Sequence, residues 1–150
     1  MTTKLTIDFT APKHGWLQLD LRSGDQKLRV SVSQTPFDSL EELASAASAF
    51  LETGRQGLVR INCEPVEYDL LLEPGSRPSS LRVRAIHYPR GRRAGGHEEV
   101  WRHESGAIQI GRTIWRAFHK LETRFASEHW THAFPSKLVE GLDRLTAVAG

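Results

Sequence analysis

A phosphate-binding loop is the first chemistry that the sequence suggests, because residues 106–113 have the sequence GAIQIGRT. The glycine spacing matches the loop whose backbone N–H groups hold nucleotide phosphates, except that Arg112 stands where that loop has lysine. The lysine is a compact charge, whereas a guanidinium is a bulkier fork, and the motif also needs a parallel sheet behind it. Neither condition is met, so we expect Ile108 and Ile110 to begin the apolar stripe of a helix and no cofactor to bind.

A metal site is the second possibility, since histidines and glutamates gather in residues 97–104, HEEVWRHE. A helical zinc site needs two histidines four residues apart, which His97 and His103 are not. On a strand these two histidines would share a face at a separation of roughly 20 Å, too far to bind one ion. His129 and His132 are closer to each other but have no obvious third ligand. The sequence therefore predicts no metal site.

Nucleophilic catalysis is not indicated by the sequence either. No Gly-x-Ser-x-Gly motif is present, and the single cysteine, Cys63, has no neighbouring base in the segment VRINCEPVEY. A lone cysteine in such a segment is typical of a small strand residue, and it forms no internal disulfide. The carboxylates, Glu64 and Glu67 among them, have no spacing that makes a pair converge. We therefore predict no catalytic residues.

Arginine is concentrated in the middle of the chain. Residues 77–116 carry nine Lys and Arg against three Asp and Glu, a net charge of +6, whereas the whole chain is at +2. Within this block, residues 87–100 (HYPRGRRAGGHEEV) place three arginines and three glycines between two strand-like segments. Such asymmetry marks an anionic partner, unless the fold brings the acidic N-terminal half against the block. We expect that pairing, with a flexible, solvated arginine loop, and keep nucleic-acid binding through Arg82 to Arg93 as the alternative.

A partner-binding surface is suggested by an aromatic residue among these arginines. In the predicted strand EEVWRHE, Trp101 alternates with Val100, so the two side chains point to opposite faces. An exposed Trp101 beside Arg102, with Arg82 and Arg84 on a neighbouring strand, would form a surface of the kind that anchors a protein partner. The more ordinary interpretation, which we favour for Trp101 by itself, is that it packs under the C-terminal helix.

The elements that must position these residues follow from the hydrophobic period. Residues 17–22 and 28–33 alternate apolar and polar side chains on either side of SGDQ, which predicts an antiparallel hairpin. Residues 39–54 change to a helical period, with Ser39 and Glu42 at capping-box spacing. Small alanines and serines on this helix would let it approach a sheet closely.

Further strands and helices complete the predicted fold. We expect an edge strand at KLTIDFT, three more strands within residues 57–86, and another at EEVWRHE. The connections are too short for parallel crossovers. Residues 110–125 repeat apolar side chains at helical spacing, and FPSKLVEGLDRL begins a shorter helix. The prediction is one α+β domain, residues 1–150. It has an antiparallel sheet of about six to seven strands, one helix inserted after the first hairpin, and two C-terminal helices packed on one face.

Composition narrows the class of protein further. Apolar residues make up 39% and charged residues 25%, which are ordinary values for a globular domain. No apolar run approaches the roughly 20 residues that span a bilayer. The segment MTTKLTIDFTAPKHG places Asp8 in its only apolar stretch, unlike a secretory signal. We therefore expect no membrane partner and a cytoplasmic location.

A family resemblance adds an expectation about function. The segments HGWLQLDL, DSLEELASAASAFL, EPVEYDLLLE and IWRAFHKL resemble small, uncharacterised bacterial single-domain α+β proteins, and the likeness spans most of the chain. Some proteins of this appearance are immunity proteins, so the resemblance implies a protein that neutralises a toxin by covering its active surface. It carries over no functional residue, and the basic middle block departs from the acidic character common in immunity proteins against nucleases.

These observations together predict a non-catalytic protein-binding domain whose partner is another protein, in its most specific form an immunity-type inhibitor of a bacterial toxin. Two alternatives stay open. One is a nucleic-acid-binding protein that uses the basic block. The other is a small enzyme or ligand binder with a pocket between sheet and helix.

Overall fold

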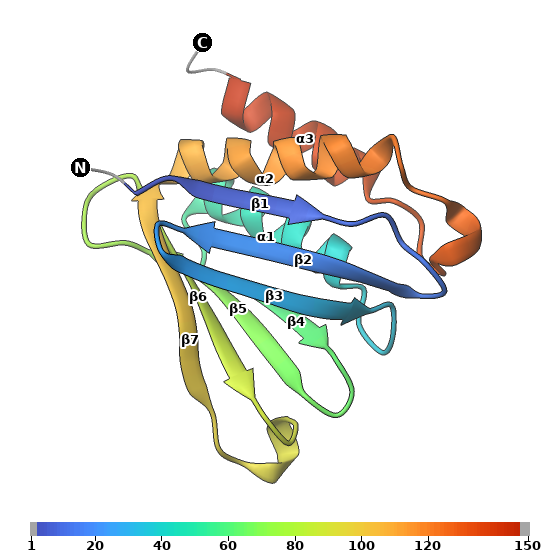
Figure 1. Ribbon diagram of the computed structural model, residues 1–150. Helices are drawn as coiled ribbons and strands as arrows, with labels where there is room; N and C mark the ends of the chain where they lie inside the picture. Colours follow the sequence, from blue (N-terminus) through green and yellow to red (C-terminus); the bar gives the residue numbers. More distant parts are fainter. Residues whose placement is uncertain (1–2, 148–150) are drawn as a thin grey trace.

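Seven strands and three α-helices make up the computed structural model, which describes residues 3–147 (Figure 1). In chain order they are β1 (Leu5–Phe9), β2 (Trp16–Ser23), β3 (Gln26–Ser33), α1 (Ser39–Thr53), β4 (Gly57–Asn62), β5 (Glu67–Pro74), β6 (Ser80–Tyr88), β7 (Glu98–Gly106), α2 (Ala107–Glu122) and α3 (Ser136–Thr146). Single 3-10 turns lie at Arg92–Ala94 and Ser127–His129. The chain is α+β, as predicted, and none of the helices described is long and apolar enough to cross a bilayer.

The strands form two antiparallel sheets, in the orders β1-β2-β3 and β4-β5-β6-β7, so the prediction of one sheet of six to seven strands is wrong. Figure 1 shows the strands of the first sheet running across those of the second. At one end of β3, the Gln26 carbonyl accepts a hydrogen bond from Trp101 Nε1 on β7 at 3.3 Å. Further along β3, the Ser31 carbonyl accepts one from Cys63 Sγ, just after β4, at 2.7 Å. Because β3 crosses the second sheet instead of pairing with it, the ladder is interrupted after the first three strands.

The helices enclose one hydrophobic core together with the inner faces of both sheets. Phe118, in the middle of the apolar stripe of α2, is fully buried and packs against Phe9 of β1, with ring centroids 5.2 Å apart. Helix α2 lies along β1, whereas α3 packs mainly against α1 and α2. The prediction that both C-terminal helices pack on one face of a sheet therefore holds for α2 and is wrong for α3.

Helix α1 is capped differently from the prediction. The Asp38 carboxylate accepts the Glu41 N–H at 3.2 Å, so Asp38 is the N-cap. Ser39 Oγ instead donates to the Arg60 carbonyl at 2.6 Å, and the Glu42 carboxylate accepts the Arg60 N–H at 2.8 Å. The predicted capping box is wrong, because both of its side chains join α1 to β4.

Two glycines allow close approach between elements. A Cβ atom on Gly57 would lie 2.8 Å from Ala46 Cβ, which shows how closely α1 approaches β4. A Cβ atom on Gly111 would lie 2.8 Å from Leu51 Cδ1 and 2.9 Å from Thr146 Cγ2, at the contact of α2 with the other two helices. Small residues on α1 therefore permit close packing on a sheet, as the sequence predicted.

Candidate functional site

Arg82, Arg84 and Arg102 project from one face of the second sheet. Arg84 lies opposite Arg102 across the β6–β7 pair, and Arg82 is two residues from Arg84 on β6, so the pleat aims all three side chains to the same side. The alternate side chains of these strands enter the core. We call the other side the outer face. It comprises Leu58, Arg60, Glu67, Asp69, Leu71, Glu73, Arg82, Arg84, Glu99, Arg102 and Glu104.

Trp101, the fourth predicted partner-binding residue, is not part of the outer face. Its side chain is 1% exposed and belongs to the core, so the prediction that it is exposed is wrong. The neighbouring Val100 is 37% exposed instead. A β-bulge causes this arrangement, since Ala85 faces Trp101 while Ile86 faces Glu99, which leaves Val100 as the extra residue. The Trp101 side chain therefore packs in the core, on the side of the sheet opposite the outer face.

Arg84 and Arg102 are tied to carboxylates on the neighbouring strands. Arg84 Nε donates to Glu73 at 2.8 Å, and its Nη1 donates to Glu99 at 3.1 Å. Glu99 also accepts a hydrogen bond from Arg102 Nε at 2.9 Å. These bonds, first that from Arg102 and then that from Arg84, hold the pKa of the Glu99 carboxyl below its usual value against the opposing effect of burial. The positive charges of this row are therefore neutralised within the protein.

Arg82 is paired in the same way. Its Nε donates to Glu104 at 2.9 Å, and its Nη1 lies 3.6 Å from Glu73. Glu104 also accepts hydrogen bonds from the Ser76 hydroxyl at 2.5 Å and the Ser76 N–H at 2.8 Å. The Ser76 hydroxyl, followed by the Ser76 N–H and Arg82, lowers the pKa of the Glu104 carboxyl to about 2. Glu104 is therefore ionised at neutral pH and keeps Arg82 paired.

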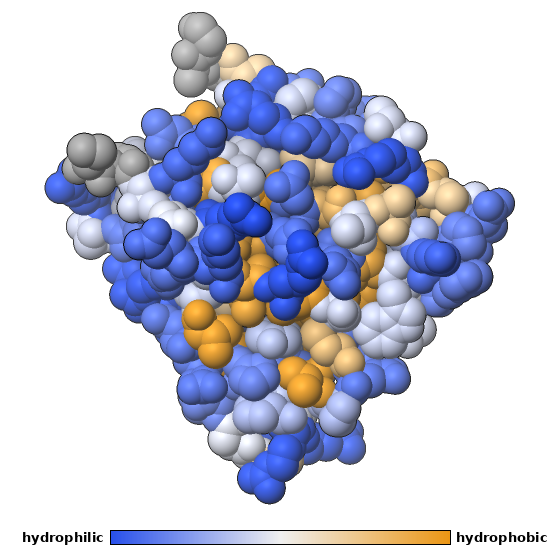
Figure 2. Space-filling view, viewed as in Figure 1, coloured by the Kyte–Doolittle hydropathy of each residue, from blue (hydrophilic) through white to orange (hydrophobic). Residues whose placement is uncertain are grey.

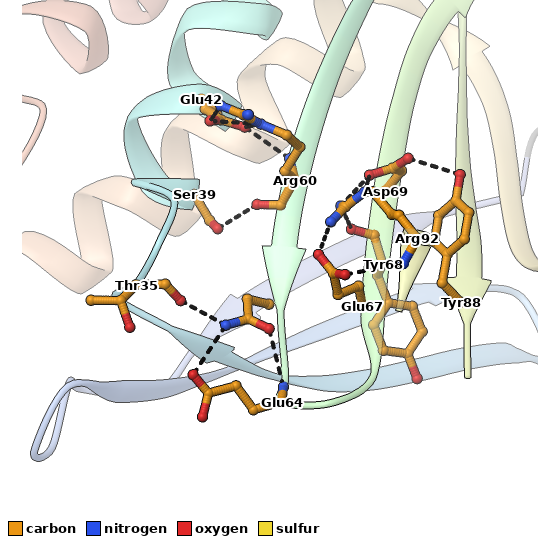
Figure 3. A network of polar contacts seen from close by, with 11 residues as sticks. Thr35, Ser39, Glu42, Arg60, Glu64, Glu67, Tyr68, Asp69, Tyr88 and Arg92 are labelled. Atoms are coloured by element: carbon orange, nitrogen blue, oxygen red, sulfur yellow. Dashed lines mark hydrogen bonds and ion pairs between the residues drawn. The ribbon is translucent and has the colours of Figure 1, made fainter. Parts of the chain in front are cut away.

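Arg92 extends these ion pairs toward the far end of the sheet (Figure 3). It comes from the loop between β6 and β7, and its guanidinium pairs with both Glu67 and Asp69 on β5. Its Nη2 also donates to the Tyr68 carbonyl at 2.8 Å, and Tyr88 Oη donates to Asp69 at 3.0 Å. The prediction of a flexible loop with solvated arginines is therefore wrong for Arg92, which holds the loop against the sheet.

The other two arginines of that loop, Arg90 and Arg93, are exposed and form no ion pair within residues 3–147. Gly91 precedes Arg92 with a φ of 85°, a left-handed conformation that favours glycine. This turn allows the backbone N–H of Arg92 to reach Glu67 at 3.1 Å. The three arginines, similar in sequence, thus differ in structure.

Apolar side chains lie among these charges. Leu58 on β4, 47% exposed, faces Leu71 on β5, which in turn faces Arg84 on β6. Beside them, Arg60 pairs with Glu42 of α1, and its guanidinium carbon lies 4.1 Å from the centre of the Phe37 ring (Figure 3 shows the Arg60–Glu42 pair). The outer face is thus a mixed surface, in which one cross-strand row combines the two leucines with Arg84 and Arg102.

The acidic partners were missed by the reasoning from sequence. Glu67, Asp69 and Glu73 occupy positions of β5 that share one face of the strand, and this spacing is visible in the sequence. Whether these carboxylates pair with arginines depends on the pairing of β5 with β6, which places Glu73 opposite Arg82. The signal was therefore present, but it could be interpreted only with the strand order.

Groups that could perform catalysis are held in structural roles. His103 is buried; its Nδ1 lies 2.7 Å from Ser23 Oγ and its Nε2 lies 2.8 Å from Ser105 Oγ. Burial lowers the pKa of His103. Burial also raises the pKa of the Cys63 thiol to about 11, so the reactive thiolate is scarce at neutral pH. Among residues 3–147, no three potential metal ligands come together.

The phosphate-loop candidate also has a structural role. Gly106 ends β7, an antiparallel strand, and α2 begins at the next residue. Arg112 donates to Asp143 of α3 at 2.6 Å. Ile110 is buried as predicted, but Ile108 is 41% exposed, so the apolar stripe of α2 begins later than predicted. The segment joins a strand to a helix and ties α2 to α3.

Comparison of the chain with protein-family models, curated proteins and solved structures found no significant match.

Proposed function

We propose that this chain is a non-catalytic protein-binding domain and that it binds another protein with its outer face. The observation that carries the proposal is the placement of the exposed Leu58 and the half-buried Leu71 beside arginines that are already paired. Arg84 and Arg102 lie in the same cross-strand row as Leu58 and Leu71. Arginine and apolar side chains are both common in the contact surfaces of protein complexes.

The pairing of charges favours protein over nucleic acid as the partner. Among residues 3–147, the four arginines of the outer face, together with Arg92 of the loop, have six carboxylate partners when Glu42 is included. Phosphate recognition requires cations that are free to neutralise phosphates. Binding DNA or RNA here would require these arginines to leave their carboxylates. Within Arg82 to Arg93, the arginines Arg82, Arg84 and Arg92 are paired, and only Arg90 and Arg93 in the loop are left without an ion pair among residues 3–147, so the nucleic-acid alternative has two free cations and no continuous basic surface.

The rigidity of the outer face also supports protein binding. Each of Arg82, Arg84 and Arg92 is fixed by at least two acceptors on neighbouring strands. Side chains that are already ordered lose less conformational entropy when a partner binds. An immunity-type inhibitor, which covers the active surface of a toxin, is the most specific form of this proposal and would use the same face.

Affinity capture from cells of the native host tests the proposal with matched variants. We expect a protein captured by the unaltered chain to be lost with Arg102→Glu and with Leu58→Asp. The control Lys137→Glu, an exposed position in the first turn of α3, should retain it. Equal capture by all four chains would contradict the proposal, provided that their thermal unfolding is alike.

Titration of labelled duplex DNA and of RNA at physiological salt tests the alternative. We expect no tight binding. Sub-micromolar affinity that falls steeply with salt and is reduced by Arg102→Glu would favour a nucleic-acid partner instead.

A further inference from the structure

A groove of about 410 Å³ lies between β1 and α2, on the first sheet and away from the outer face. Figure 1 shows α2 running along β1, which is an edge strand because, among residues 3–147, β2 alone pairs with it. The groove follows residues 3–7, which include the start of β1, and Ile110 and Ala117 of α2, both almost completely buried, form its apolar floor. Figure 2, seen from the same side, shows hydrophilic side chains interspersed with apolar surface.

The charges that line this groove are all positive. Lys4 comes from the segment before β1, and Arg116 and Lys120 come from α2. All three are exposed, none forms an ion pair within residues 3–147, and no carboxylate lines the groove. Unpaired cations over an apolar lining favour a ligand that carries both carboxylates and apolar groups.

The backbone of β1 is also available along this edge. In an antiparallel pair, facing residues alternate between hydrogen-bonded and non-bonded pairs. The Thr10 N–H donates to the Gln18 carbonyl at 3.0 Å, which fixes the alternation along β1 and β2. Thr10 and Gln18 are therefore a hydrogen-bonded pair, and bonded and non-bonded positions alternate residue by residue back along β1. Leu5 and Ile7 are at non-bonded positions, so their N–H and C=O groups point away from β2.

A contact at the end of the same edge supports this orientation. The carbonyl of Phe9, two residues beyond Ile7, accepts a hydrogen bond from Arg124 Nη2 at 3.1 Å, just after α2. Leu5 and Ile7 line the groove, and no hydrogen bond within residues 3–147 occupies their backbone groups on that side. Such an edge is the kind to which an extended peptide adds as a further strand.

We propose that this groove binds an extended acidic segment of a partner protein, which pairs with β1 as an additional strand. Alternate side chains of an added strand point to opposite sides. Apolar ones would enter the groove above the floor formed by Ile110 and Ala117, while carboxylates would pair with Arg116 and Lys120. The length fits, because five extended residues span about 16 Å and the eleven steps from Gln109 to Lys120 on α2 also span about 16 Å. This proposal does not rest on the proposed function, since it concerns the first sheet and different residues.

Fluorescence anisotropy with a synthetic probe tests the proposal. The probe is a labelled seven-residue peptide of alternating valine and glutamate, titrated with the full chain. We expect saturable binding that weakens at least tenfold with the double variant Arg116→Glu/Lys120→Glu and stays unchanged with Lys137→Glu. A probe N-methylated at alternate residues, which lacks the donors for strand pairing, should also bind at least tenfold more weakly.

Amide hydrogen exchange on the unaltered chain gives a second measurement that does not depend on the folding of a variant. We expect the probe to slow exchange at Leu5 and Ile7, while Thr6 and Asp8, already bonded to β2, change little. The proposal is overturned by absence of saturable binding, by equal affinity of the double variant, or by equal affinity for a probe with lysine in place of glutamate. Binding of the probe without protection of Leu5 and Ile7 from exchange would also overturn the proposal. Displacement of the probe by inorganic phosphate at the same concentration would do the same. Either result indicates an anion site only.

Discussion

The outer face and the groove beside β1 both present arginine or lysine, yet the two regions use these charges in opposite ways. On the outer face, Arg84 lies between Glu73 and Glu99 and has no free charge to offer. In the groove, Arg116 and Lys120 have no acidic neighbour among the lining residues. A basic stretch of sequence therefore indicates an anionic partner only where the fold leaves its cations unpaired.

Strand register accounts for this difference. Residues of β5 and β6 face each other in fixed pairs, so the backbone pairing of the two strands holds Glu73 opposite Arg82. On α2, Gln109, Thr113, Arg116 and Lys120 form a stripe at helical spacing that faces the free edge of β1. No strand lies there to bring a carboxylate, so the stripe keeps its charge.

The largest expected effects come from the residues beneath the two regions. The ring of Trp101 packs on the side of the second sheet opposite the outer face, and the ring of Phe118 on α2 packs against Phe9 of β1. Truncation of either to alanine should lower the free energy of unfolding by about 3–5 kcal/mol, through lost transfer energy and a residual cavity. Denaturant unfolding measures both. A loss under about 1 kcal/mol for Trp101→Ala would mean that its ring is outside the core.

Arg92→Ala should have the next largest effect. It leaves the Asp69 carboxylate, on a residue that is 7% exposed, without its cation, and should cost about 2–3 kcal/mol of unfolding free energy. The matched control is Arg90→Ala/Arg93→Ala in the same loop, for which about 0.5 kcal/mol or less is expected. If the control cost as much as Arg92→Ala, the loop would be held by all three arginines.

A direct comparison of the two regions comes from truncating one arginine in each. Arg84→Ala removes two charge-assisted hydrogen bonds from half-buried partners and should cost about 1 kcal/mol. Arg116→Ala removes no ion pair and should change the free energy of unfolding by less than about 0.5 kcal/mol. Chemical denaturation of the two variants in parallel checks this, and equal losses would remove the distinction between paired and unpaired cations.

The smallest expected effect is the contribution of Glu104, on the outer face, to the pH dependence of stability. The pKa of the Glu104 carboxyl is lowered from the ordinary 4.5 to about 2. Its contribution to stability is therefore fully present above pH 4.5 and is lost as the pH falls from 4.5 toward 2. Carboxyl NMR should give a midpoint near 2 for Glu104, and Glu104→Gln should flatten acid unfolding in that window. A midpoint near 4.5 would show that the contacts with Ser76 and Arg82 are absent in solution.

Much of the secondary structure could be predicted from local patterns, since each pattern reports the burial of one element. Alternation in residues 17–22 and 28–33 predicts β2 and β3, and helical spacing predicts α1 and α2. The wrong predictions concern which group a polar side chain binds when more than one is within reach. Ser39 and Glu42 were available to cap α1 but bind Arg60 on a neighbouring strand.

Of the candidate site, the sequence alone determined that Arg82 and Arg84 share a face, because residues two apart on one strand point to the same side; that Arg102 joins them follows from the pairing of β6 with β7. Only the tertiary structure decided the rest. It decided which side of the sheet holds Trp101, which carboxylates pair with each arginine, and how the strands divide into two sheets. It also decided that the groove leaves Arg116 and Lys120 unpaired. The physical reason is that alternation records whether a side chain is buried, whereas ion pairing and edge exposure depend on which strands lie side by side, and the pattern of one strand contains no information about its neighbours.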